Sequence, residues 1–259
     1  MANRTALQTF GRSGNPMFRG NAFQPDATFG ETDSTQRMTL AGAVNKTGIL
    51  LVLCLVSAGY VWNQFFQSGG SGAVKGLMML GLLGGLAMAM VTIFKRQWAG
   101  LTAPAYALLQ GLAMGGISAM FEMQYPGIVI QAVGLTFGTL AVLLLAYKTG
   151  LIKPTENFRF MIVAATGGIA VLYLVSFVMS FFGTSIGFIH SNGLFGIGFS
   201  LFVVAIAALN LVLDFDFVEA GAEQGAPKYM EWYGAFSLMV TLVWLYLEIL
   251  RLLAKLRSR

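Results

Sequence analysis

Charged side chains are scarce in this sequence. Only 10% of its 259 residues are Asp, Glu, Lys or Arg, whereas 56% are hydrophobic. A soluble domain usually carries about 25% charged residues. Together with apolar runs of about 20 residues that recur along the chain, this deficit indicates a polytopic membrane protein.

Cysteine and histidine each occur only once. Cys54 as the only cysteine excludes an intrachain disulfide and any site with several cysteine ligands. His190 as the only histidine excludes the usual zinc hydrolase site, which needs several histidines. Residues 183–187 read Gly-Thr-Ser-Ile-Gly and match G-x-S-x-G, but that motif requires a strand–turn–helix context, and here it joins two apolar segments. We therefore expect no enzyme, and hydrolysis through Ser185 and His190 is the least favoured hypothesis.

The net charge of +5 does not indicate nucleic-acid binding, because the basic residues lie at helix ends and in tails without interleaved aromatics. Residues 1–45 form a polar tail without the compact apolar run of a signal peptide. We expect this tail to be mostly disordered or to lie on the bilayer surface. Its basic residues favour a cytoplasmic location. Residues 46–259 would form the transmembrane domain.

Seven apolar segments are each about long enough to span a bilayer. They cover residues 47–66, 73–94, 98–121, 128–147, 160–182, 193–213 and 232–253. The second and fourth linkers, 95–96 and 148–159, are basic, whereas the first, third and fifth contain almost no Lys or Arg. This alternation predicts an inside amino terminus and, after seven spans, an outside carboxyl terminus. The basic residues at the end of the chain oppose that orientation of the last span. The alternative is that the last segment re-enters the membrane and returns inside, but we favour spanning because the segment is long enough.

Pairs of glycines four residues apart allow helix backbones to approach closely. The sequence has such pairs at Gly111 and Gly115 and at Gly134 and Gly138. A further cluster comprises Gly81, Gly84 and Gly85. These spacings favour packing against other helices, and the alternative is that glycine is simply common in membrane helices.

Acidic residues gather at the end of the sixth segment, in AALNLVLDFDFVE at 207–219. A carboxylate at the centre of a membrane helix costs about 2.5–3.5 kcal/mol, so an acid beside such a segment is a candidate functional residue. On a helix, Asp216, Glu219 and Glu223 share one stripe, which is typical of a solvated face. Asp214 lies on another face and is the better inward candidate. The alternative is that both aspartates only mark the wet end of the helix.

The seventh segment carries a second acid. Thr241 and Glu248 are seven residues apart and share a helix face. Arg251 follows Glu248 at i+3, so we expect these two charges to neutralise each other.

Several stretches resemble the Bax inhibitor-1 family (YccA/YetJ-like, TMBIM). They are LVLDFDFVE at 211–219, AFSLMVTLVWLYLEILRLL at 235–253, and the amino-terminal GRSGNPMF at 11–18 and MTLAGAVNKTGILL at 38–51. The last two are similar to the bacterial branch with a long tail. The resemblance implies an all-α fold of seven transmembrane helices with the last helix central, in the inner membrane of a bacterium.

The resemblance also implies a site. The best-described members of the family are pH-sensitive calcium leak channels. One Asp on the sixth helix and one on the seventh close their pore, with an Arg of the second helix nearby. Asp214 matches the sixth-helix Asp, but the seventh-helix Asp falls on Thr241. The Arg of the second helix has no direct match, and Arg96 or Lys95 is the nearest basic residue, with Arg96 as the possible partner of Asp214. The pair of acids is therefore missing, which puts pH gating in question.

We therefore expect a passive cation leak channel, with Ca²⁺ as the permeant or bound ion and no cofactor. Hard cations take oxygen ligands, so the expected pathway or gate residues are Asp214, Thr241, Asn210 and Glu248, with Asp214 as a candidate calcium ligand. The alternative is a regulatory protein without transport activity. It would bind a membrane protease or another membrane partner through the tail 1–45.

Overall fold

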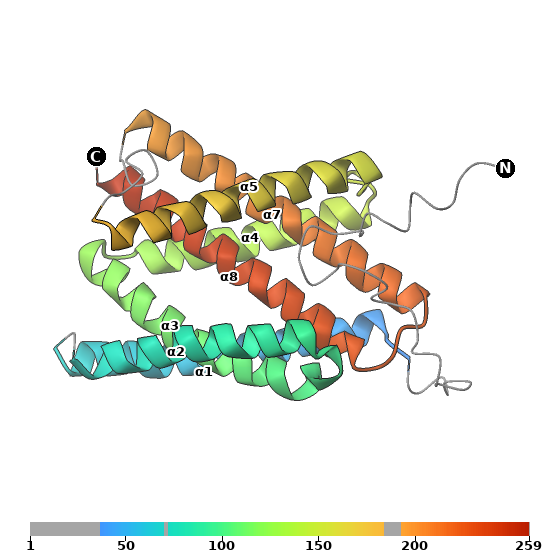
Figure 1. Ribbon diagram of the computed structural model, residues 1–259, viewed down its shortest axis with the longest axis horizontal. Helices are drawn as coiled ribbons and strands as arrows, with labels where there is room; N and C mark the ends of the chain where they lie inside the picture. Colours follow the sequence, from blue (N-terminus) through green and yellow to red (C-terminus); the bar gives the residue numbers. More distant parts are fainter. Residues whose placement is uncertain (1–36, 70–71, 184–192, 259) are drawn as a thin grey trace. The chain divides into compact units, whose positions relative to one another are not determined.

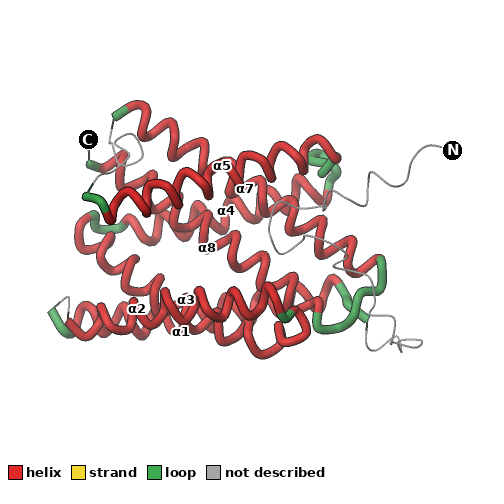
Figure 2. Tube along the Cα trace, viewed as in Figure 1, coloured by secondary structure: helices red, strands yellow, loops and turns green. Residues whose placement is uncertain are grey.

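The computed structural model describes residues 37–69, 72–183 and 193–258, and within them every long element is a helix (Figures 1 and 2). Short loops join the helices, as Figure 2 shows. The helices are α1 (Leu40–Gln67), α2 (Gly72–Phe94), α3 (Ala99–Gln124), α4 (Ile128–Lys148), α5 (Glu156–Phe181), α7 (Leu194–Glu223) and α8 (Met230–Arg257), and a 3₁₀ turn, η4 (Arg96–Trp98), precedes α3.

All seven predicted segments are helices, but two helices extend well beyond the predicted ends. Helix α1 begins at Leu40 rather than at residue 47, because the Thr39 hydroxyl caps it by accepting a hydrogen bond from Gly42 N at 3.0 Å. Helix α7 continues through the acidic stretch and ends at Glu223. Gly225 then adopts a φ of 66°, which a residue with a Cβ disfavours, and turns the chain towards α8.

Within the part of the chain that the structure describes, six helices are long and apolar enough to cross a membrane: α1, α2, α4, α5, α7 and α8. The protein is therefore a multi-pass membrane protein. Helix α3 is long enough, with 26 residues, but its composition does not place it among these apolar helices. The expected seven spans are accordingly not confirmed, although the all-α fold is.

The chain divides into two compact units. The described residues of unit 1 lie in Ile130–Asp216 and Thr241–Arg259. Those of unit 2 lie in Phe23–Val129 and Phe217–Val240. Helices α7 and α8 each contribute one part to unit 1 and another to unit 2.

Close backbone contacts hold α1, α2 and α3 side by side in unit 2 (Figure 1). A Cβ added at Gly115 would collide with the backbone of Ala58 in α1, and one at Gly81 would lie 2.5 Å from Leu109 O in α3. The predicted packing role of these glycines is therefore confirmed. It is wrong for Gly134 and Gly138, where an added Cβ would meet nothing within 4 Å.

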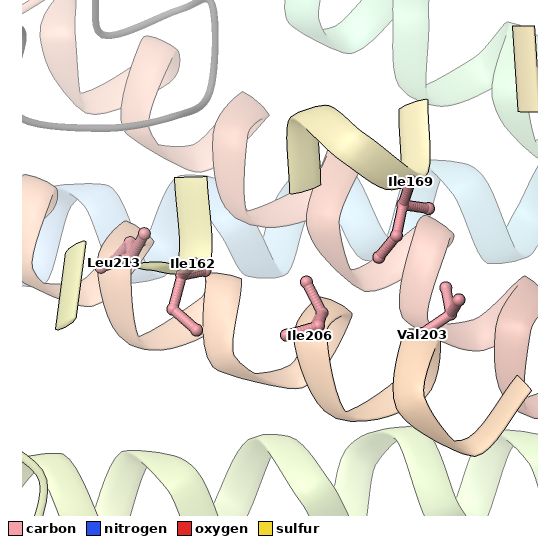
Figure 3. Packing of buried hydrophobic residues seen from close by; sticks show 5 residues of the cluster. All are labelled: Ile162, Ile169, Val203, Ile206 and Leu213. Carbon is pink, nitrogen blue, oxygen red and sulfur yellow. The ribbon is translucent and has the colours of Figure 1, made fainter. Parts of the chain in front are cut away.

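An apolar seam joins α5 to α7 in unit 1 (Figure 3). Ile162 and Ile169 of α5 pack against Val203, Ile206 and Leu213 of α7. These positions recur at intervals of three or seven residues, so they lie along one face of each helix. This seam positions the polar residues described next.

Helix α8 is no more buried than α7. Of the residues in the apolar window of each helix, 56% are buried in both α7 and α8, against 17% in α1, α2, α4 and α5. Burial therefore separates these two helices from the other four but does not single out α8 as the central one.

Candidate functional site

Asn210 is held inside the seam between α5 and α7. It lies one turn after Ile206 and is only 7% exposed. Its side-chain amide donates hydrogen bonds of 2.8 Å to Thr166 Oγ1 of α5 and of 2.8 Å to the Ile206 carbonyl. These bonds offset the cost of burying the amide among apolar side chains. The sequence had not pointed to Thr166.

Asp214 lies one further turn along α7 and is 2% exposed. Its side chain is therefore inside the protein, as expected of the inward candidate. Asn210 and Asp214 are four residues apart and so share a face of α7. This face of α7 therefore carries a buried amide and, one turn later, a buried carboxylate.

Asp216 does not belong to a solvated stripe, so that prediction is wrong for this residue. Its two carboxylate oxygens accept hydrogen bonds of 2.8 and 2.7 Å from Arg159 Nη2. The side chains of Arg159 and Asp216 are 24% and 22% exposed, so this ion pair is partly shielded from water. Sequence reasoning placed Arg159 in a basic linker but gave it no partner.

Glu248 is engaged in a closed polar cluster with Tyr173 and Arg251. Its carboxylate is 1% exposed and accepts hydrogen bonds from the Tyr173 hydroxyl at 3.0 and 3.1 Å and from Arg251 Nη1 at 2.8 and 3.0 Å. Arg251 also donates to the Tyr173 oxygen at 2.8 Å. The predicted pairing of Glu248 with Arg251 is confirmed. The sequence gave no signal for Tyr173, because no spacing rule links α5 to α8.

Lys255 is buried near the carboxyl end of α8. It is 6% exposed, and its ammonium donates to the Gly196 carbonyl at 3.0 Å and to Ser200 Oγ at 2.8 Å. Arg257 donates to Gln131 Oε1 at 3.0 Å. Both basic side chains are thus bound to other parts of unit 1.

We call these groups of unit 1, which follow one another along α5, α7 and α8, the polar column. Its members are Arg159, Thr166, Tyr173, Ser200, Asn210, Asp214, Asp216, Glu248, Arg251 and Lys255. Along α7, the contacts run from Asp216 to Gly196, which is about 30 Å at 1.5 Å per residue. That length is close to the thickness of a membrane's hydrocarbon core.

The structure brings only some of the predicted site residues together. Thr241 is 5% exposed and lies on α8 in unit 1, about 10 Å along the helix from Glu248. Arg96 belongs to unit 2, where its guanidinium lies over the Tyr233 ring at 5.5 Å. The proposed partnership of Arg96 with Asp214 stays a prediction.

Other predicted features fall outside the described residues. They are Ser185, His190 and residues 1–36 of the tail. Among the residues that the structure describes, no group of three or more His, Cys, Asp or Glu is placed to hold a metal ion. The assignment of Asp214 as a calcium ligand therefore rests on its chemistry and burial alone.

The chain matches the family model described as Bax inhibitor 1 like over residues 15–258, which covers both units. It belongs to the Bax inhibitor 1 like family. No match was found among curated proteins or among solved structures. Membership in the Bax inhibitor 1 like family confirms the resemblance seen in LVLDFDFVE and AFSLMVTLVWLYLEILRLL.

Proposed function

We propose that this member of the Bax inhibitor 1 like family is a passive cation leak channel, with Ca²⁺ as its ion and the polar column as its pathway. The observation that carries the proposal is the burial of Asp214, which is 2% exposed and follows directly on residues 194–213 of α7, a stretch without a charged side chain. A carboxylate in such a place costs about 2.5–3.5 kcal/mol on insertion scales. Its presence there therefore indicates a function.

The chemistry of the column suits a hard cation. Ca²⁺ takes six to eight oxygen ligands from carboxylates, carbonyls, amides and water. Asp214, the Asn210 side-chain oxygen and the Thr241 hydroxyl supply oxygens in the buried part of unit 1. Water would complete the shell, so the ion would pass through this region rather than remain there.

The arrangement described is a closed one. Arg159 lies towards one end of the column, and Arg251 and Lys255 lie towards the other. Both arginines are held in ion pairs, with Asp216 and Glu248, so contacts between side chains of different helices would close the two ends. Conduction would require the side chains at the ends to move. Asp214 would contribute to closure by accepting a hydrogen bond or an ion pair across the helices, which a proton or a cation bound to its carboxylate would release.

The basic carboxyl end is compatible with an outside location. Arg251, Lys255 and Arg257 all bind partners within unit 1, so they stabilise the fold in addition to any effect on orientation. The earlier basic linkers then set the orientation. We place the protein in the inner membrane of a bacterium with its amino terminus in the cytoplasm.

The test is calcium flux into proteoliposomes that contain the purified full chain. Asp214→Asn keeps the shape of the side chain but removes its charge, and we expect the leak to rise several-fold. Glu223→Gln makes the same charge change at an exposed position of α7 and should leak like the wild type. Equal leak in Asp214→Asn and wild type, or a wild-type leak no greater than that of empty vesicles, would contradict the proposal.

A further inference from the structure

The starts of α1 and α8 and the η4 turn before α3 meet in unit 2 (Figure 1). Glu231 and Trp232, in the first turn of α8, contact Lys46 of α1 by an ion pair and by a cation–π contact at 5.4 Å. Tyr233, the next residue, lies under the guanidinium of Arg96 at 5.5 Å. A Cβ added at Gly100 of α3 would lie 3.5 Å from the Trp232 ring.

Two more basic residues adjoin the same place. The backbone of Arg37 pairs with that of Pro227, in the loop before α8, as an isolated antiparallel β-bridge. Lys228 lies 3.4 Å from Glu231 and is 50% exposed. We define the basic surface by six residues, five of them basic: Arg37, Lys46, Lys95, Arg96, Lys228 and Trp232.

This surface carries excess positive charge. Residues 37–46, 95–100 and 223–233 contain five basic and two acidic residues, which is a net charge of +3. One of the two acids, Glu231, is 0% exposed and already binds Thr39 and Lys46. Glu231 therefore neutralises charge inside the protein and not at its surface. The exposed lysines would still attract an anion from outside.

Apolar side chains that face outward adjoin the basic residues. Leu40 and Val44, on the first turns of α1, are 53% and 59% exposed, and Leu101 of α3 is 78% exposed. Trp98, which is 58% exposed, precedes α3. Tryptophan is enriched where a membrane protein crosses from hydrocarbon to headgroups. A ligand that fits the whole surface therefore has an anionic head and apolar chains.

We propose that this surface binds the headgroup of an anionic phospholipid. The lysines and Arg96 would hold the phosphate by charge-assisted hydrogen bonds, and the acyl chains would lie along Leu40, Val44 and Leu101. The site belongs to unit 2, whereas the polar column belongs to unit 1, and the proposal does not rest on the proposed ion leak.

The test is native mass spectrometry of the full chain in detergent micelles that contain equal amounts of phosphatidylglycerol and phosphatidylcholine. The wild type should retain phosphatidylglycerol in preference. Lys95→Gln/Lys228→Gln alters two exposed lysines of the basic surface and should lower that preference by about fivefold for each lysine removed. Lys228→Gln alone should give about half of this effect on a logarithmic scale and guards against misfolding of the double variant.

The matched control is Lys148→Gln/Lys153→Gln, which removes two exposed lysines of unit 1 and leaves the basic surface intact. It should retain phosphatidylglycerol like the wild type. An equal loss in the control would show attraction by total charge alone and overturn the proposal. A competition with inorganic phosphate gives a second check. If inorganic phosphate displaces bound phosphatidylglycerol as effectively as added phosphatidylglycerol does, the site recognises a free phosphate and the proposal is overturned.

Discussion

Removal of the charge of Glu231 should destabilise the protein strongly. The carboxylate is fully buried and accepts hydrogen bonds from Thr39 N at 2.9 Å and Thr39 Oγ1 at 2.8 Å, while Lys46 donates to its other oxygen. In Glu231→Gln the amide carbonyl keeps the bonds to Thr39, but Lys46 loses its ion pair and faces an amide NH₂. Loss of one partner of a buried ion pair costs about 3–5 kcal/mol, and a hydrogen bond to a charged group contributes about 1.5–3 kcal/mol. Since Lys46 keeps 16% exposure, we expect the free energy of unfolding to fall by about 2–4 kcal/mol.

The assay is equilibrium unfolding of the full chain in mixed micelles of increasing dodecyl sulfate content, followed by tryptophan fluorescence. Lys46→Gln and the double variant complete a mutant cycle, and the coupling energy between Lys46 and Glu231 should be about 1.5–3 kcal/mol. Lys228→Gln, which removes the half-exposed partner, should change stability by less than about 1 kcal/mol. A change below about 0.5 kcal/mol in Glu231→Gln, the range of ordinary surface substitutions, would refute the reasoning.

Two further predictions concern packing and the polar column. Gly115→Ala forces a methyl group against the backbone of α1 and should lower stability by about 1–3 kcal/mol, whereas Gly134→Ala meets open space and should be neutral or stabilising. Equal effects of the two substitutions on the unfolding midpoint would contradict the packing argument. Tyr173→Phe removes the hydroxyl that donates to Glu248 and accepts from Arg251, so stability should fall by about 1–2 kcal/mol in the same assay. An unchanged midpoint would mean that the hydroxyl adds nothing to the ion pair.

Local patterns predicted the all-α class, the places of the helices and those parts of the site that depend on one helix. Apolar runs located all seven helices, and the i+3 spacing found the pairing of Glu248 with Arg251. Helical geometry also separated Asp214 from Asp216. These predictions succeeded because helix periodicity acts within a few residues.

Contacts between distant segments could not be found in this way. The partner of Asp216 lies 57 residues away in Arg159, and Tyr173 is 75 residues from Glu248. Glycine spacing was equally ambiguous: it identified real contacts at Gly115 but not at Gly134. Spacing shows which side chains share a face, but not which other helix covers that face.

The bond between Thr39 and Glu231 also has a consequence for biogenesis. The two residues are 192 positions apart, so the carboxylate is the last part of this contact to leave the ribosome. At a synthesis rate of about 5–20 residues per second, Lys46 would wait roughly 10–40 s for its partner. During that interval its ammonium must remain among water and lipid headgroups. Unit 2 therefore closes only after the chain has been synthesised almost to its end.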